Sequence, residues 1–151
     1  MSKPPDTPLT RKEYEEFIYT ISESYPAIEV STLVVIMIAS ENAEVFGEIL
    51  FADDIRLEVT EVLSFDDQRI EDYGYTVYRG EEKLYWYDSQ PHPNDPSLAS
   101  TDPHHKHVAP DIKHNRIPAP GLSFTQPNLP FLIEEILSSS LSGESADESD
   151  D

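Results

Sequence analysis

Residues 27–88 constrain the fold most, because short runs there are either β-branched or alternate apolar with polar side chains. Five strands are expected in this stretch, at residues 27–39, 46–52, 55–65, 70–79 and 83–88. Only Glu61 and Val62 break the alternation of the third run, which indicates a bulge. Turns are expected at Asp53-Asp54 and Gly80-Glu81-Glu82. A parallel crossover needs about a dozen residues or more, so connections this short predict an antiparallel meander of about five strands.

Two helices are expected to flank the strands. Thr10 and Glu13 match a capping box, and the residues after it recur at helical spacing: Tyr14, Phe17, Ile18, Ile21 and Tyr25. Pro26 ends this first helix. Asn128 can cap a second helix, whose apolar face would consist of Leu129, Leu132, Ile133, Ile136 and Leu137. The sequence therefore predicts an α+β fold, with an N-terminal and a C-terminal helix packed on one face of the meander and the other face free.

A single domain is expected at residues 9–141, between a disordered N-terminus at 1–8 and a disordered acidic tail at 142–151. Within this domain, residues 89–126 show no periodicity and contain seven prolines. Proline excludes a helix and disfavours a central strand, so a Pro/His-rich loop is predicted there. Loops of this length are usually either functional or disordered.

The formal charge of −20 is unevenly distributed. Residues 1–90 hold 20 acids and 7 bases, and residues 134–151 hold seven acids and no base. Between them three acids balance three bases, and all five histidines lie in this neutral segment. A molecule this acidic repels nucleic acid at long range. An RNA substrate would therefore have to reach the neutral segment.

Targeting signals are not evident. The longest apolar run is far shorter than the roughly 20 residues of a membrane helix, and the N-terminus lacks the apolar core of a signal peptide. Cysteine is absent, which excludes disulfides and thiolate ligands. We expect a cytoplasmic protein that does not bind a membrane.

The sequence Pro103-His104-His105-Lys106-His107 concentrates chemically active side chains. Metal-free phosphodiester cleavage requires a neutral histidine as base, a protonated histidine as acid, and a cation that stabilises charge on the phosphorane. His104, His105 and His107 are the acid–base candidates, and Lys106 is the candidate stabiliser. Which histidine is the acid and which the base stays open.

Five further residues are candidates for substrate binding. His92 could orient one of the catalytic histidines. Tyr85 and Tyr87, on the strand that leads into the loop, could stack a base. Lys113 and Arg116 could hold flanking phosphates.

Other interpretations of the same residues are available. The histidines could belong to a solvated, inert loop, or they could bind Zn²⁺ or Ni²⁺ together with Asp102 or Asp111. Their spacing matches no standard metal pattern, so we expect no metal and no cofactor. The tyrosines of the last two strands could equally serve in packing, as aromatic residues of strands commonly do.

Two motifs together resemble the TumE-like toxin family of bacterial toxin–antitoxin systems. They are Trp86-Tyr87-Asp88-Ser89-Gln90-Pro91-His92 and Pro103-His104-His105-Lys106-His107. The segment 51–57 is also similar, with Asp53-Asp54 where the family tends to have Asp-Gly-Ser, and the likeness covers residues 30–136. The resemblance implies a small α+β toxin neutralised by a cognate antitoxin. It implies no mechanism, so RNA cleavage is inferred from the histidines alone.

We therefore interpret the chain as the toxin of a toxin–antitoxin pair and as a candidate ribonuclease acting on RNA, either free or on the ribosome. The alternative is a non-enzymatic acidic interaction module that binds a basic partner protein. Histidines that converge with Lys106 in one cleft would favour the enzyme, and histidines that splay into solvent would favour the module.

Overall fold

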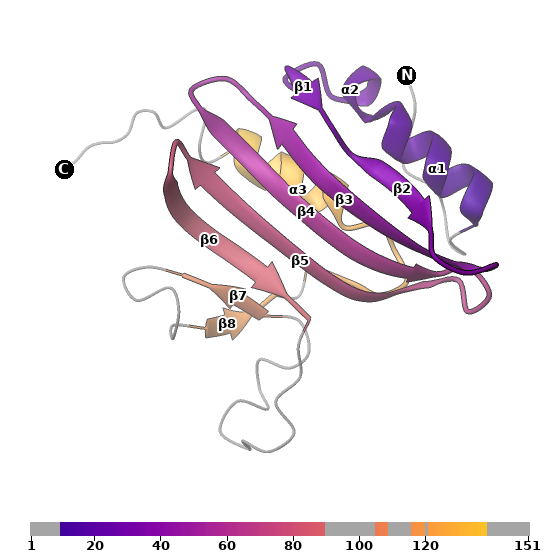
Figure 1. The fold of residues 1–151 in the computed structure, drawn as a ribbon. Coiled ribbons are helices and arrows are strands. Elements are labelled where there is room, and N and C mark those ends of the chain that lie inside the picture. The colour runs from indigo at the N-terminus through magenta and orange to yellow at the C-terminus, as the bar shows by residue number, and fades with distance from the viewer. Residues whose placement is uncertain (1–9, 90–104, 109–115, 120, 139–151) are drawn as a thin grey trace.

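The computed structural model describes residues 10–89, 105–108, 116–119 and 121–138. In this part of the chain, eight strands form one antiparallel sheet, and helices from both ends of the sequence pack on it (Figure 1). The elements are α1 (Arg11–Tyr19), α2 (Ile21–Ser24), β1 (Val30–Ser31), β2 (Val34–Met37), β3 (Asn42–Leu50), β4 (Ile55–Ser64), β5 (Arg69–Arg79), β6 (Glu82–Asp88), β7 (His105–His107), β8 (Arg116–Pro118) and α3 (Leu129–Ile136). The predicted α+β class is confirmed. The termini predicted to be disordered, 1–8 and 142–151, lie outside the described residues.

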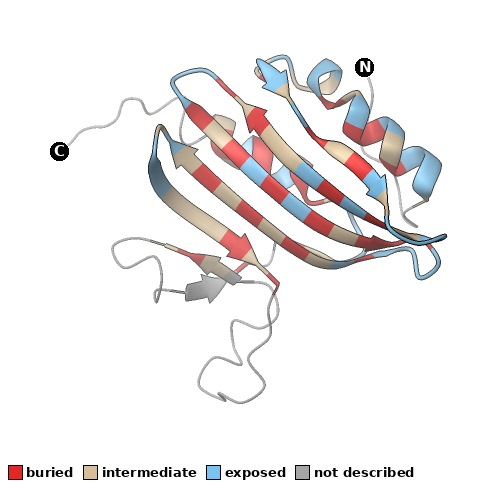
Figure 2. Cartoon of the chain, viewed as in Figure 1, coloured by how far each residue is buried: buried red, intermediate tan, exposed pale blue. Residues whose placement is uncertain are grey.

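The sheet is a meander in which two short strands, β1 and β2, share the first edge by pairing with different parts of β3. Its order is β1-β3-β4-β5-β6-β7-β8, and β2 also pairs with β3. In Figure 1, α3 lies behind the sheet and α1 runs beside β2, while the face toward the viewer carries no helix. We call this uncovered surface the open face. Buried and exposed residues alternate along the strands in Figure 2, as expected when only one face is covered.

The helices pack through the predicted stripes, since Phe17, Ile21, Ile133 and Ile136 are all buried. The first helix is broken earlier than predicted, because the Thr20 hydroxyl donates to the Glu16 carbonyl (2.7 Å) and α1 ends at Tyr19. Such bonds to the preceding turn often bend a helix.

Asn128 is the N-cap residue of α3, as predicted, but its side chain makes no capping bond to the helix. It bonds instead to both backbone groups of Ser123 and donates to the Tyr75 hydroxyl (3.1 Å). Asn128 therefore ties the segment before α3 to the sheet.

The predicted strand at 27–39 is divided into β1 and β2. Thr32, between them, bonds the Glu48 carbonyl through its backbone N–H, and its hydroxyl accepts from the Glu48 N–H. Gly47 lies opposite with φ +139°, and a Cβ there would come within 2.7 Å of the Thr32 carbonyl oxygen. The irregular backbone at this crossing explains why one long strand does not form.

Replacing Gly47 with alanine should lower the free energy of unfolding by about 2–4 kcal/mol, since the added methyl meets backbone at an unfavourable φ. Urea denaturation would measure the loss. Gly74→Ala is the matched control, because the Cβ there meets only the Thr60 hydroxyl, at 3.1 Å. Equal stability of the two variants would contradict this account.

The predicted loop at 89–126 is also corrected, because it contains β7 and β8. β7 has no proline, and Pro118 lies in β8, the last strand of the sheet order, where a missing N–H is tolerated. The predicted bulge is displaced slightly, since the register shifts between Val62 and Leu63, where β5 contributes an additional residue.

Glu61 keeps the alternation of β4 and points into the core, where it is 1% exposed. Its carboxylate accepts hydrogen bonds from the hydroxyls of Tyr14 on α1 (2.6 Å) and Tyr75 on β5. Burial raises the pKa of Glu61 to about 7, although the two tyrosine bonds act in the opposite direction. Through Tyr75 and Asn128, this buried network joins both helices to the sheet.

Candidate functional site

The two motifs that carry the histidines lie side by side, because β6 and β7 pair. Trp86 is opposite His107, Tyr87 is opposite Lys106, and Asp88 is opposite His105. Segments separated in the sequence are thereby joined by one antiparallel ladder near an edge of the sheet (Figure 1).

His107 is buried between side chains of β6. Its ring stacks on the indole of Trp86, with centroids 4.2 Å apart and planes inclined by 18°. Its Nε2 lies 3.3 Å from Oδ2 of Asp88, and the residue is 6% exposed. On the same strand, the Lys83 ammonium lies 4.6 Å from the Trp86 ring centroid. An aromatic ring and a carboxylate thus fix the imidazole from two directions.

Lys106 occupies a different environment, beneath α3. Its Nζ lies 3.0 Å from a carboxylate oxygen of Glu135 and 4.3 Å from the Tyr85 ring centroid. The Tyr87 hydroxyl donates to the same carboxylate, with its two oxygens at 2.7 and 2.8 Å. Lys106 is therefore held in a partly buried ion pair with cation–π contacts.

The two tyrosines of this cluster remain protonated phenols at neutral pH. Burial is the largest cause that raises the pKa of both Tyr85 and Tyr87, and the nearby Glu135 carboxylate adds to it. The Tyr85 hydroxyl is buried close to Glu135 without a hydrogen bond of standard geometry. Tyr87 is 2% exposed, and the packing interpretation of the tyrosines accounts for its surroundings.

Lys106 and His107 lie on opposite faces of β7. Tyr87 and Lys106 face α3, whereas Trp86 and His107 belong to the open face, because successive side chains of a strand alternate. One phosphate group cannot contact both side chains while β7 keeps this pairing. His107 therefore does not converge with Lys106 in one cleft, and being buried it does not splay into solvent either.

Several predicted site residues cannot be placed. His92, His104 and Lys113 lie outside the described residues, whereas His105 and Arg116 have strand positions but no described side chain. Their catalytic and substrate-binding roles stay predictions.

Three residues that matter here were not selected from the sequence: Trp86 and Asp88, which contact His107, and Glu135, which binds Lys106. Trp86 and Asp88 are two residues apart and belong to a motif already quoted, so the two-residue spacing of a strand could have paired them on one face. No local signal connects Glu135 with Lys106.

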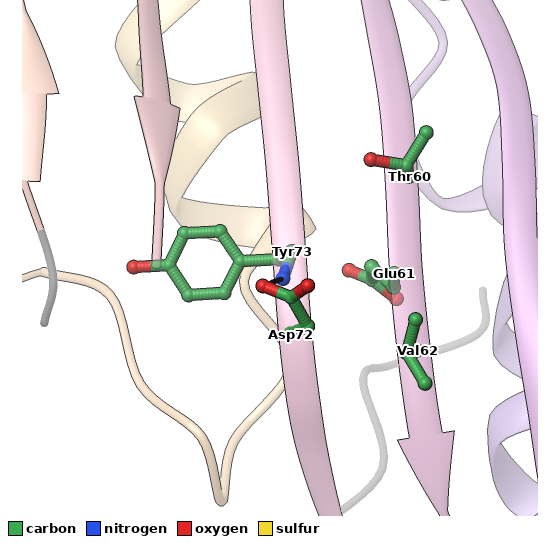
Figure 3. A pocket seen from close by; sticks show the side chains of 5 residues that line it. All are labelled: Thr60, Glu61, Val62, Asp72 and Tyr73. Atoms are coloured by element: carbon green, nitrogen blue, oxygen red, sulfur yellow. Dashed lines mark hydrogen bonds between the residues drawn. The ribbon is translucent and has the colours of Figure 1, made fainter. Parts of the chain in front are cut away.

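A hollow of about 250 Å³ opens between β4 and β5 at the bulge, and Figure 3 shows the residues that line it: Thr60, Glu61, Val62, Asp72 and Tyr73. Asp72 accepts hydrogen bonds from the Ser89 hydroxyl and the Tyr73 N–H there. Glu61, whose pKa burial raises to about 7, also lines the hollow, but its carboxylate oxygens are bonded to Tyr14 and Tyr75.

Within the described ranges, no three histidine or acidic side chains gather as a metal site would require, and no helix there could span a membrane.

Comparison with known families gives one finding. A family model described as Toxin TumE matches residues 17–140, which confirms the resemblance seen in the two motifs. No curated protein and no solved structure matches the chain.

Proposed function

Because the chain belongs to the Toxin TumE family, we propose that it is a toxin that cleaves RNA without a metal, with His107 as one of its acid–base groups. Membership of the family implies a cognate antitoxin as its partner. The proposal adds the reaction and the residues that perform it.

The observation that carries the proposal is the environment of His107. A carboxylate bonded to one ring nitrogen orients an imidazole and stabilises its protonated form, as in other acid–base sites. Asp88 is in position to do this, at 3.3 Å from Nε2. Trp86 lies on the same face and is partly exposed, so it replaces Tyr85 and Tyr87 as the aromatic side chain best placed to contact a base.

His104 and His105 immediately precede this imidazole, and we propose that one of them is the second acid–base group. Lys113 and Arg116 remain the proposed phosphate contacts, and His92 the proposed orienting residue. For Lys106, the proposed role as charge stabiliser requires its ammonium to exchange Glu135 for a phosphate. It also requires β7 to change its pairing, because Lys106 and His107 lie on opposite faces of this strand.

The role of Lys106 can be separated from structural support with two variants. Lys106→Ala should weaken RNA cleavage under either role. Glu135→Gln should preserve cleavage if the ammonium stabilises charge on the substrate, because it releases Lys106 without removing it. If Lys106 only holds β7 against α3, Glu135→Gln should lose activity as Lys106→Ala does, and the role of charge stabiliser would be withdrawn.

The reaction itself is tested with purified protein, total bacterial RNA and intact ribosomes. Acid–base cleavage should proceed equally with and without EDTA, since it uses no metal. The ribonuclease function would be ruled out if RNA and ribosomes stayed intact while the protein still arrested growth. The toxin assignment would then remain in place.

A non-enzymatic toxin that binds a basic partner is the second candidate. The acidity of the chain favours it, since a formal charge of −20 attracts basic proteins. Under this alternative, variants of His107 that fold would remain toxic.

A further inference from the structure

We propose that the open face at β1, β2 and β3 binds the cognate antitoxin, through a segment that presents both apolar and basic side chains. We call this surface the β1–β3 patch and define it by Val30, Ile36, Ile38 and Phe46 with the flanking Glu44 and Glu58. The proposal rests on the antitoxin partner of the family and not on RNA cleavage.

The apolar part of the patch follows from the register of the strands. Val34 pairs with Phe46 and Ile36 with Glu44, while the intervening Val35 and Val45 are buried beneath the helices. Ile36 and Phe46 therefore point to the open face, where they are 46% and 44% exposed. Val30 and Ile38 extend the patch, at 47% and 54% exposed.

Exposed apolar side chains are concentrated in the patch. Among the described residues six large apolar side chains are exposed, and four of them lie in the patch. Single exposed apolar residues are ordinary on a protein surface, but several on neighbouring strands of one face, flanked by acidic side chains, are typical of a protein-binding site.

The charge around the patch indicates the chemistry of the partner. Glu44 and Glu58 are exposed on the same face, and within the described residues no ion pair is seen for either. The nearest base on these strands, Arg56, binds Glu48 at 3.0 Å and lies 3.9 Å from the Tyr78 ring centroid. With −20 on the whole chain, the patch should attract a basic segment.

The same charges disfavour a second copy of this chain as the occupant. Two identical patches brought face to face would place Glu44 and Glu58 of both copies together, and juxtaposed like charges oppose association. A basic partner gains from the same arrangement.

The position of the patch also accounts for how a bound antitoxin would neutralise the toxin. It shares the open face with Trp86 and His107 but lies toward the opposite edge, four strand steps from β7. Four steps of about 4.8 Å amount to about 19 Å. A helix of about 13 residues has that length, so a segment anchored on Phe46 could extend across the strands as far as His107 on β7.

The binding test uses the full chain and, as the probe, the purified product of the reading frame adjacent to its gene. Calorimetry should show binding to the wild type that weakens as salt increases, because the complex joins opposite charges. Ile36→Ser/Phe46→Ser should weaken binding by about 30-fold or more, as expected for central apolar anchors. The matched control is Phe131→Ser, since this aromatic side chain on α3 is 39% exposed and should be neutral for binding.

A charge-neutralising pair completes the test. Glu44→Gln/Glu58→Gln should weaken binding by about 10-fold and reduce its salt dependence. Glu23→Gln/Glu81→Gln removes the same number of exposed acids elsewhere and should cause less than half of that loss. Melting curves verify that each variant is folded, and the serine substitutions are at exposed positions.

In cells, if toxicity comes from the His107 site, the Ile36→Ser/Phe46→Ser variant should still arrest growth but escape neutralisation by the co-expressed adjacent product. The proposal would be overturned if this variant bound the adjacent product with wild-type affinity and were fully neutralised by it. It would also be overturned if the adjacent product did not bind the wild type. Absence of RNA cleavage alone would leave the docking surface standing, because no arm of this test measures RNA.

Discussion

Glu61→Gln should become more stable relative to the wild type as pH increases, by about 3 kcal/mol between pH 4.5 and pH 8. The carboxyl group has an ordinary pKa of 4.5, and burial raises the pKa of Glu61 to about 7 in the folded protein. The folded state therefore binds the proton more tightly than the unfolded chain. Stability from this group is fully present below pH 4.5 and is lost as pH rises through about 7. Each unit of pKa shift corresponds to about 1.4 kcal/mol, and the shift is about 2.5 units.

The surroundings of Glu61 make the glutamine variant a fair comparison. Its hydrogen-bond partners are Tyr14 on α1 and Tyr75 on β5, and Asn128 in turn bonds the Tyr75 hydroxyl. An amide of the same shape can exchange hydrogen bonds with the tyrosine hydroxyls. Burial and the Glu61 charge raise the pKa of both tyrosines, so they stay neutral across this pH range.

Urea denaturation from pH 4.5 to pH 8 would measure the effect as the difference between variant and wild type. Taking this difference removes the contribution that repulsion among the many other acids makes to the free energy of unfolding, which also changes with pH. Glu58→Gln is the control for the loss of one acid from the same strand, because this glutamate is exposed and its replacement leaves the Glu61 carboxyl in place. A difference for Glu61→Gln that does not vary with pH would show that its carboxyl does not titrate in this range.

Strands and turns could be predicted wherever the determining interactions are local. The Asp53-Asp54 turn is confirmed, with φ of 64° and 65° at the two residues, the left-handed conformation of a tight type I′ hairpin turn. Alternation also placed β4 and β5 correctly. Glu61 seemed to break the pattern only because its partners are distant, and Tyr14 is 47 residues away along the chain.

β7 could not be predicted from its own sequence. Three residues are too few to show a period, and the strand exists because β6 presents a ladder to pair with. The same reason applies to β8, which pairs with β7 at the edge.

The sequence predicts the candidate site as a cluster of neighbouring residues. It does not indicate on which face of a strand each side chain lies, or which distant residues contact it. Neighbours on a strand alternate between faces, so Lys106 and His107 are separated although they are adjacent in the chain. Their partners Glu135 and Asp88 come from other elements, at separations of 29 and 19 residues. Only tertiary pairing brings these carboxylates to the motif.

The largest effect is expected at His107. His107→Ala and His107→Gln should both lower RNA cleavage by about 10²–10⁴-fold, which is the usual contribution of a general acid or base. The glutamine variant is the informative one, because its amide can still bond Asp88 and fill the space beside Trp86, yet it cannot exchange a proton at neutral pH. Asp88→Asn should cause a smaller loss, since the imidazole remains and only its orienting carboxylate is neutralised.

Growth after expression without antitoxin, followed together with RNA integrity, would compare these variants with the wild type. Trp86→Phe is the control for packing, because a smaller ring can still stack on the imidazole and should preserve most of the cleavage. A His107→Gln protein that is folded, toxic and active on RNA would show that this histidine only packs. The acid–base role would then have to pass to His104 and His105. Loss of toxicity in both His107 variants, with retained binding of the antitoxin, would locate the toxic activity on the Trp86 side of β7 and separate it from the β1–β3 patch.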